Sequence, residues 1–330
     1  MANVSVATVS YILNNTPGKS ISEETRRRVL SAAQELNYYP SASAQRLKTN
    51  RAKCIAVRLS RNLTMPRYHQ MIQGIRTYLA GHGYSILLAS YDGRGSLAGC
   101  MDACMSGQAD GLIYIAAEGV GILPDEMNRI RKWGIPVSAI DCMGSVPDVS
   151  SVVYDYYSSS RDRMDILIQN GFRKFLYLRP TYRNYKETAR EQGVRSVLLE
   201  RDDVAIDVRY LQFLDENWIS RSDNRMFDAF TLTLMREVKE YMAGLPTDVA
   251  VICYSREVQE MASRVLFAES LRNPTPETAN WEKRSISYQF PHADAGVEAA
   301  RSLLNMLDGD KTPRKISLRP ILNFTNPEVF

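Results

Sequence analysis

Between Cys54 and Tyr254, short apolar runs rich in Val, Ile and Leu alternate with longer segments of helical periodicity. This alternation constrains the fold more than any other feature of the chain. Strands that alternate with helices form parallel sheets, because each parallel pair needs a crossover connection that a helix usually supplies. We therefore expect an α/β core with strands over 54–59, 84–90, 112–115, 137–141, 151–154, 174–178, 203–210 and 248–254.

The expected elements form two consecutive units of similar size. Helices between the strands are predicted over 67–81, 96–107, 124–132, 158–170, 186–200 and 226–243. The first unit ends near Tyr154, and Asp155 either faces the space between the units or caps the following helix. Paired α/β units bind small molecules in a cleft at the carboxyl ends of their strands. The sequence thus predicts a two-lobed binding body over 54–330.

The first 53 residues differ from this body in charge. They contain eight Lys and Arg against three Glu, whereas the whole chain of 330 residues has a net charge of +4. The positive excess therefore lies in the head. A basic head on a near-neutral body is typical of polyanion binding, although a solvated tail with chance basic residues has the same composition.

Helical periodicity in the head favours a folded unit over a tail. Ser5 is a suitable N-cap for a short helix whose apolar residues recur at i, i+3 and i+4 from Val9. Ser22 would cap a second helix that runs to Leu36, with acidic residues in its first turn. A third short helical piece is predicted over 42–47.

These segments resemble the DNA-binding head of the lactose-repressor (LacI/GalR-type) family of transcriptional regulators. The likeness rests on Val4–Ser10, on the helix 22–36, and on the pattern Tyr39-Pro40-x-x-x-Ala44-x-x-Leu47. It implies a partial helix-turn-helix head over 1–40, in which the first helix of the motif is missing, and a hinge helix with linker over 41–53. A start codon placed too late is our preferred interpretation of the missing helix, and a truncated head with impaired DNA affinity is the alternative.

The resemblance also implies which residues contact DNA. The helix after Ser5 would lie in the major groove, where small apolar side chains suit thymine methyl groups. The hinge helix would fold on DNA and wedge Leu47 into the minor groove. Tyr11 stands where the family usually has Arg, which removes an expected guanine contact. The DNA-binding residues implied are Ser5, Val6, Ala7, Thr8, Ser10, Tyr11, Tyr38, Ala44, Gln45 and Leu47.

The body resembles the effector-binding core of the same family, which is similar to periplasmic sugar-binding proteins with two lobes and three crossovers. The likeness rests on Ala109–Ile113, Gly134–Asp141, Val152–Asp155, Arg190 with Gly193, and Pro291 with Gly296. It implies that lobe one spans about 54–154 and 285–314. Lobe two would span about 155–284 and 315–330.

The resemblance places a small polar ligand between the lobes. Arg190 is the strongest candidate contact, since its guanidinium fork suits vicinal hydroxyls or a carboxylate. Asp141 would accept a hydrogen bond from a sugar hydroxyl. Tyr68 and Tyr91 would supply a stacking face, or each is a half-buried structural tyrosine. Ser255 completes the expected ligand-binding residues.

One departure from the family pattern falls at this ligand site. Ser255-Arg256 stands where the family commonly has Asn-Asp after the strand that ends at Tyr254. Two alternatives therefore stay open for the cleft: an unusual ligand, or no ligand.

Patterns for catalysis and metal binding are weak. The sequence has no glycine-rich phosphate loop, and its three histidines are scattered. Cys100 and Cys104 lie one helical turn apart and could hold a soft metal, but packing is the more common role of such cysteines. We expect no enzymatic activity, no cofactor and no metal.

The sequence also bears on where the protein works. Its five cysteines, an odd number with irregular spacing, suit a reducing cytoplasm. It has no run of 18 apolar residues and no secretory signal, so we expect no membrane span.

The sequence therefore predicts a DNA-binding transcriptional regulator, with repression as the expected mode. A small polar effector, such as a sugar or related metabolite, would control its affinity for operator DNA. A homodimer on a near-palindromic operator would match the two-fold symmetry of such proteins. The alternative is a soluble small-molecule binding module with a vestigial, non-functional DNA-binding head.

Overall fold

A computed structural model describes most of the chain. The described residues are 2–13, 18–38, 51–59, 66–89, 97–116, 121–142, 148–212, 224–310 and 312–324. The chain divides into two compact units, Met1–Lys53 and Cys54–Phe330. The expected hinge helix over 42–47 lies outside the described residues.

In the described residues of the first unit, the helices are α1 (Val6–Leu13) and α2 (Glu23–Glu35). Ser22 caps α2, since its side chain accepts a hydrogen bond from the backbone amide of Thr25 at 3.2 Å. Ile12 and Val29 are the buried apolar side chains of α1 and α2. The first two expected helices therefore form, and within the described part of the head they bury few apolar side chains.

The second unit begins with a parallel sheet, which we call the lobe-one sheet. Among the described residues its strand order is β10-β5-β4-β3-β1-β2, and every neighbouring pair is parallel. The strands are β1 (Cys54–Leu59), β2 (Ser85–Ala89), β3 (Gly111–Ile115), β4 (Val137–Ile140), β5 (Ser150–Tyr154) and β10 (Lys315–Leu318).

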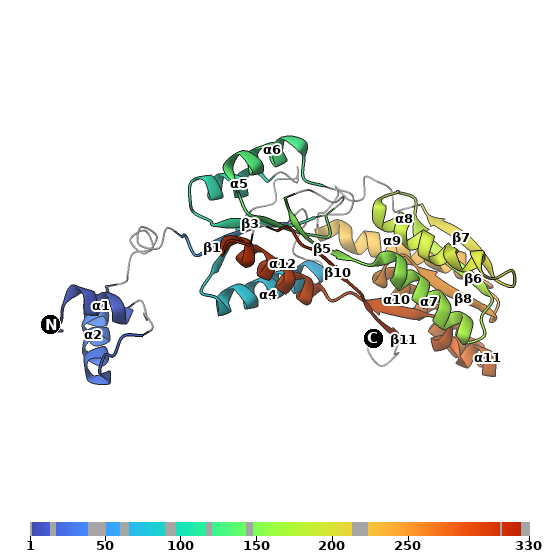
Figure 1. Cartoon of the computed structure of the whole chain (residues 1–330). Coiled ribbons are helices and arrows are strands. Elements are labelled where there is room, and N and C mark those ends of the chain that lie inside the picture. Colours follow the sequence, from blue (N-terminus) through green and yellow to red (C-terminus); the bar gives the residue numbers. More distant parts are fainter. Residues whose placement is uncertain are drawn as a thin grey trace. The chain divides into compact units, whose positions relative to one another are not determined.

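Helices cover both faces of the lobe-one sheet. As a result, β1 buries side chains on both sides. Ile55 and Val57 pack in a core with α4 (Pro66–Gly81) and α12 (His292–Leu307). Ala56 faces the other way, toward α5 (Ala98–Met105) and α6 (Pro124–Trp133). Figure 1 shows α5 and α6 on one side of the sheet and α4 and α12 on the other. This two-sided cover is what a buried parallel sheet requires.

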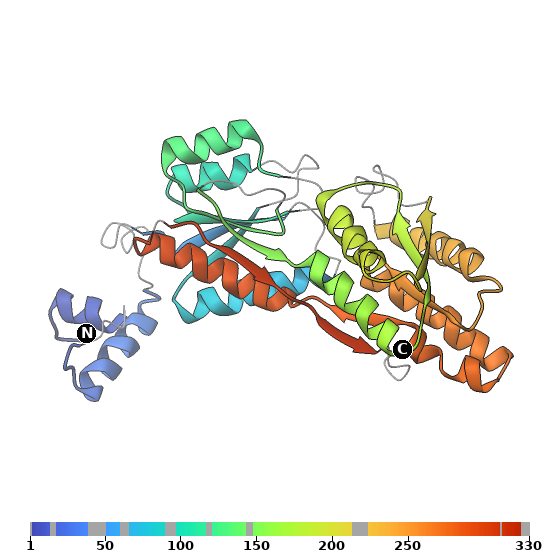
Figure 2. The same ribbon diagram turned by 45° about the vertical axis from the view of Figure 1, so that its right-hand side comes forward.

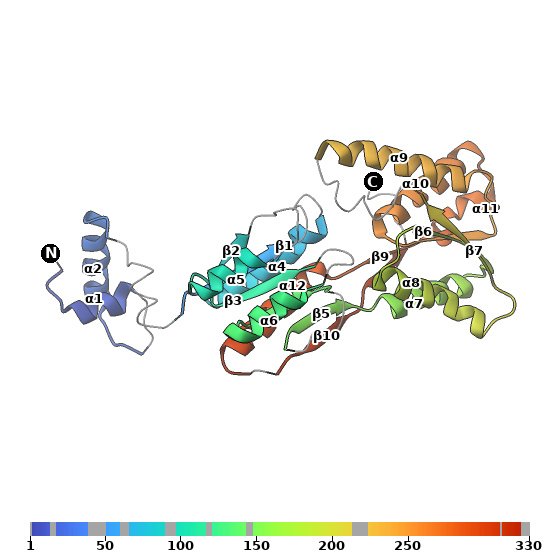
Figure 3. The ribbon, with the colours of Figure 1, turned by 90° about the horizontal axis from the view of Figure 1, so that it is seen from above.

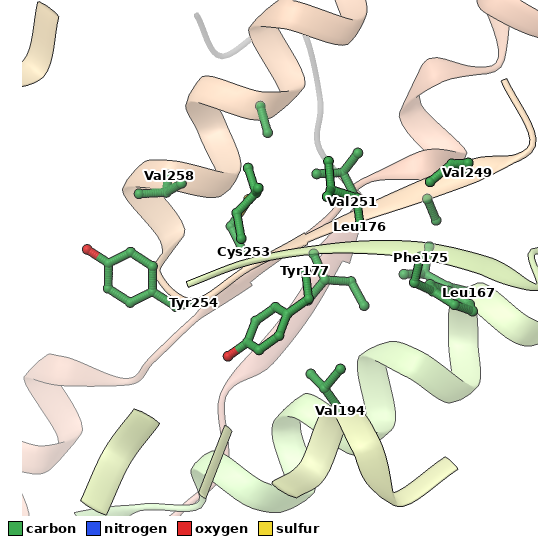
Figure 4. Close-up of a cluster of buried hydrophobic side chains, with 14 of the residues drawn as sticks. Leu167, Phe175, Leu176, Tyr177, Val194, Val249, Val251, Cys253, Tyr254 and Val258 are labelled. Carbon is green, nitrogen blue, oxygen red and sulfur yellow. The ribbon is translucent and has the colours of Figure 1, made fainter. Parts of the chain in front are cut away.

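Lobe two has a smaller parallel sheet with the order β7-β6-β8 among the described residues. Its elements are β6 (Lys174–Pro180), β7 (Ala205–Leu211), β8 (Val249–Cys253), α7 (Tyr156–Gln169), α8 (Tyr185–Arg195), the 3₁₀ turns 196–199 and 281–284, α9 (Asn224–Met242), α10 (Arg256–Arg272) and α11 (Pro276–Ala279). Figure 4 shows Tyr177 of β6 beside Val194 of α8 on one side of this sheet. Cys253 of β8 and Val258 of α10 lie on the other side. The helical head with an α/β body of parallel sheets is the fold class that the sequence predicts, and it is confirmed.

The lobe boundaries differ from those expected near the C-terminus. The strand β9 (Ile286–Gln289) pairs with β11 (Ile321–Phe324), and Ser285 just before it bridges β8 at Val251. This β9–β11 pair thus continues lobe two, although 285–291 was expected in lobe one. Conversely, β10 pairs with β5 in lobe one, although 315–330 was expected in lobe two. Figure 3 shows β10 beside β5.

The physical reason for this difference lies in the side chains of β10. Ile316 and Leu318 are its apolar residues, and both pack against the lobe-one core. The described chain passes between the lobes at Asp155, at 290–291 and at 319–320.

The close approach of α4 and α12 depends on two glycines. A Cβ added to Gly296 would collide with the main-chain oxygen of Met71, and one added to Gly74 would collide with the main-chain oxygen of Ala293. Figure 2 shows the two helices side by side, α4 in cyan and α12 in red. Because backbone meets backbone here, neither helix accepts a side chain at these positions without moving.

We expect Gly296→Ala to destabilise the second unit by about 1–3 kcal/mol through overpacking. The matched control is Gly99→Ala in α5, where an added Cβ meets nothing within 4 Å. That control should be neutral or more stable by about 0.5–1 kcal/mol, because alanine favours a helix over glycine. Thermal unfolding followed by circular dichroism compares the two, and equal midpoints would contradict the close contact.

Candidate functional site

The leading end of α1 presents small side chains to solvent. Val6 is 87% exposed, and Ala7 beside it is also exposed. Ser5 caps the helix, since its Oγ accepts a hydrogen bond from the backbone amide of Thr8 at 3.1 Å and lies 2.9 Å from the Thr8 hydroxyl. This end of α1 therefore offers methyl groups beside hydroxyls, which suits contact with base edges and phosphates.

The other head residues expected to contact DNA differ from one another in exposure. Ser10 and Tyr11 are half-buried, and the Lys19 ammonium lies 5.0 Å from the centre of the Tyr11 ring. Tyr38 is exposed just after α2, where Arg27 and Arg28 are exposed as well. Ala44, Gln45 and Leu47 lie outside the described residues.

A cavity of about 530 Å³ takes its lining from both lobes of the second unit. It is lined by four of the five residues that the sequence predicts at the ligand: Tyr68, Asp141, Arg190 and Ser255. Tyr91, the fifth, lies outside the described residues. The expected residues are thus brought together from α4, the end of β4, α8 and the start of α10.

Asp141 is held by the protein itself. Its Oδ2 accepts hydrogen bonds from the Tyr156 hydroxyl at 2.8 Å and from the Lys186 ammonium at 2.5 Å. The Tyr185 hydroxyl lies 2.9 Å from Oδ1 and 3.0 Å from the main-chain oxygen. Asp141 also has a φ of 56°, a left-handed conformation that Asp tolerates better than most residues. The Asp141 carboxylate, directly after β4, is therefore held in position by its backbone conformation and by its hydrogen-bond partners.

Charges around the cavity are largely balanced within the protein. Lys186 pairs with Asp141, and Arg190 pairs with Glu187, the buried residue three positions earlier on α8. The Arg190 guanidinium also lies 4.3 Å from the centre of the Tyr156 ring, a cation–π distance. Lys186 and Arg190 are therefore both paired with carboxylates of the protein itself.

Tyr156, Tyr288 and Phe290 form an aromatic wall of the cavity, and Tyr154 packs against the same Phe290 ring. The centre of the Phe290 ring lies 4.8 Å from that of Tyr154, 5.2 Å from Tyr156 and 5.0 Å from Tyr288. His292 follows on the same wall, and its Nδ1 is 2.7 Å from the Tyr154 hydroxyl. Burial, aided by the positive charge of Arg67, lowers the pKa of His292 to about 4. The imidazole is therefore neutral at pH 7.

Several expected residues have structural roles as well. Ser255 caps α10, since its Oγ accepts a hydrogen bond from the Val258 amide at 3.3 Å. Asp155 caps α7 through a 2.9 Å hydrogen bond from the Ser158 amide, which was one of its two expected roles. Tyr68 is buried, and its hydroxyl accepts a hydrogen bond from Arg67 at 3.3 Å.

Sequence reasoning missed the residues Tyr156, Lys186, Phe290 and His292 of this cavity. A Lys at the start of a helix is normally solvated, so nothing in the local pattern marked Lys186. The segment Phe290-Pro291-His292 could have been found as a crossover that returns the chain to lobe one.

The two cysteines of α5 are held as neutral thiols. Burial raises the pKa of Cys100 to about 11 and that of Cys104 to about 12, so both thiols are neutral at pH 7. Over the described parts of the chain, no group of three or more His, Cys, Asp or Glu is arranged to hold a metal ion. None of the helices described has the length and apolar character needed to cross a membrane.

A helical head and a two-lobed α/β body with a cavity between the lobes define a class of ligand-sensing regulatory proteins. Two family models match the chain. Residues 1–41 match "Bacterial regulatory proteins, lacI family", and residues 54–280 match "Periplasmic binding proteins and sugar binding domain of LacI family". The chain belongs to the LacI family of bacterial regulatory proteins.

Individual relatives agree with this assignment. The chain is 24% identical to "HTH-type transcriptional regulator RegA" of Clostridium saccharobutylicum over 323 residues, which cover 93% of this chain and 90% of that protein. It is 26% identical to "HTH-type transcriptional repressor PurR" of Photobacterium profundum over 276 residues, 82% of this chain and 75% of that protein.

A solved structure supports the fold. The "transcriptional regulator CelR-cellobiose complex" matches with a TM-score of 0.58 and 21% identity, over 98% of this chain and 95% of that one. The expectation of a transcriptional regulator rather than an enzyme is confirmed by the family and these relatives.

The lowered pKa of His292 has a consequence for stability. Below pH 6.5 the unfolded chain protonates this imidazole, whereas the folded protein does so only near its pKa of about 4. Stability contributed by this group is therefore complete above pH 6.5 and is lost as the pH falls toward 4. We expect acidification from pH 7 to pH 5 to destabilise the protein by about 2 kcal/mol through His292. Chemical denaturation at both pH values measures this change, and His292→Gln should lack it. An equal pH dependence in the variant would show that another group is responsible.

Proposed function

We propose that this chain is a transcriptional repressor that binds operator DNA through its head and a small polar ligand in its cavity. The cavity carries the proposal because both lobes line it. A ligand that contacts both lobes favours one arrangement of the lobes over another, and such differential binding is what coupling to DNA affinity requires.

The proposed DNA contacts begin at the leading end of α1. Val6 and Ala7 would meet thymine methyl groups, while Ser5 and Thr8 would bond phosphate or base edges. Ser10, Tyr11 and Tyr38 would complete the contacts, with Ala44, Gln45 and Leu47 in the hinge segment. The exposed arginines of α2 would add salt-dependent affinity that is independent of sequence. The exposure of Val6 and Ala7 supports this assignment.

The proposed ligand is neutral and rich in hydroxyl groups, such as a sugar. Arg190 would bind vicinal hydroxyls, Tyr68 and the aromatic wall would stack against a sugar ring, and Asp141 and Ser255 would accept hydrogen bonds. The balanced charge of the cavity supports this class of ligand. A related regulator of the same fold was solved as a cellobiose complex.

The proposed assembly is a homodimer on a near-palindromic operator, because two heads then meet equivalent half-sites one helical turn apart. A protein that acts on bacterial DNA in this way works in the cytoplasm.

The second candidate function is a small-molecule binding module whose head does not bind DNA. What favours that alternative is that, among the described residues of the head, α1 and α2 each bury one apolar side chain, Ile12 and Val29.

Val6→Asp tests the head. We expect the full-length wild-type protein to select a specific operator from random DNA, and Val6→Asp to weaken that binding about tenfold or more. The new carboxylate repels phosphates and removes a methyl contact. Fluorescence anisotropy at several salt concentrations measures the affinity. The matched control is Leu199→Asp, because Leu199 on the body is 88% exposed. Wild-type protein that binds all DNA equally, or binds none, would favour the module without a DNA role.

Arg190→Ala tests the cavity. In a thermal-shift screen of mono- and disaccharides, we expect a sugar to raise the unfolding temperature of the wild type, because it binds only the folded state. Arg190→Ala should abolish that shift. Arg195→Ala is the control on the same helix, since Arg195 pairs with Glu191 and does not line the cavity. A shift that persists in Arg190→Ala would remove this residue from the ligand site.

A further inference from the structure

The carboxylate of Asp141 connects the two lobes. Asp141 follows β4 of lobe one, whereas its three side-chain partners belong to helices of lobe two. Tyr156 is the first residue of α7, and Tyr185 and Lys186 are the first two residues of α8. One acceptor from lobe one is therefore held by three donors from lobe two.

The ion pair between Asp141 and Lys186 is buried. The side chain of Lys186 is 3% exposed and that of Asp141 is 10% exposed. Burial and the Asp141 carboxylate both raise the pKa of Tyr156 and of Tyr185, so both phenols stay protonated as donors. A buried carboxylate needs such partners, because an unpaired charge in this setting is strongly unfavourable.

Packing joins the same segments. The ring of Tyr156 is buried in the lobe-one core, and Tyr185 and Ala189 of α8 pack against that core. The first turn of α8 is thus attached to lobe one by apolar contact as well as by charge.

We propose that Asp141 and Lys186 form a latch that holds the two lobes together when no ligand is bound. The Lys186 ammonium donates a hydrogen bond to the Asp141 carboxylate, which was expected to accept one from a ligand hydroxyl. A ligand that reaches Asp141 must therefore compete with Lys186. The regulatory meaning of this competition rests on the proposed function, whereas the latch itself does not.

Hydroxyl-radical footprinting of the full-length protein, without DNA or ligand, tests the latch. Met71 is buried and lines the cavity from α4, while Met127 is also buried in lobe one but does not line the cavity. Lys186→Met leaves the Asp141 charge unpaired, so the lobes should separate to hydrate it. We expect oxidation of Met71 to rise about tenfold or more, with Met127 unchanged.

Two further variants complete the test. Lys174→Met is the control, because Lys174 pairs with Asp248 at 2.8 Å within lobe two and both side chains are exposed, 61% and 58%. The Lys174→Met variant should therefore oxidise Met71 at the wild-type rate. Asp141→Asn in the Lys186→Met background removes the remaining charge and should lower the Met71 rate again.

An unchanged Met71 rate in Lys186→Met would overturn the latch. A parallel rise of Met71 and Met127 would also overturn it, since that pattern indicates general loosening of lobe one. If Lys186→Met fails to fold, Asp141→Asn alone gives the same test from the other partner. Failure of the latch would leave the Val6 and Arg190 results intact, so the two proposals are separable.

Discussion

Parallel strand pairing is the constraint on which the rest of the body depends. In each lobe it sends the carboxyl ends of neighbouring strands to one edge of the sheet, and the cavity lies at those edges. Asp141 directly follows β4, and Ser255 follows β8 after one residue. The same pairing requires helices on the faces, which is why α8 is available to bring Lys186 and Arg190 to the cavity from the other lobe. The ligand site is therefore a consequence of sheet topology as much as of individual residues.

The order of strands and helices up to Tyr254 could be predicted from the sequence, because buried parallel strands read as continuous apolar runs. The strand at Cys54–Leu59 matches its predicted bounds, and the helix expected over 186–200 forms as α8 followed by a 3₁₀ turn. The strand pairing of the C-terminal segment could not be predicted in the same way. The strands β9 and β10 are four residues long and only partly buried, so their partners depend on tertiary packing and not on local pattern.

The residues of the candidate site likewise fall into those that could be predicted from the sequence and those that could not. Asp141, Arg190 and Ser255 could be predicted because each lies at a strand end or in a recognisable motif. Lys186 could not, since the cause of its burial is a carboxylate 45 positions earlier in the chain. Sequence reasoning assumed that polar groups in the cleft await a ligand, whereas the fold supplies partners of its own. Polar cleft residues must therefore be judged by what they already contact.

The aromatic wall has a spectroscopic consequence. Tyr154, Tyr156 and Tyr288 are buried and packed around Phe290, and Tyr156 and Tyr288 line the cavity. Tyrosine rings fixed in an asymmetric setting produce signals in near-ultraviolet circular dichroism, whereas freely rotating rings do not. Trp281 belongs to the lobe-two core and lies 5.5 Å from the ring of Phe267, away from this wall. Occupancy of the cleft will accordingly be visible as a change in tyrosine bands, whereas Trp281 reports on the core of lobe two.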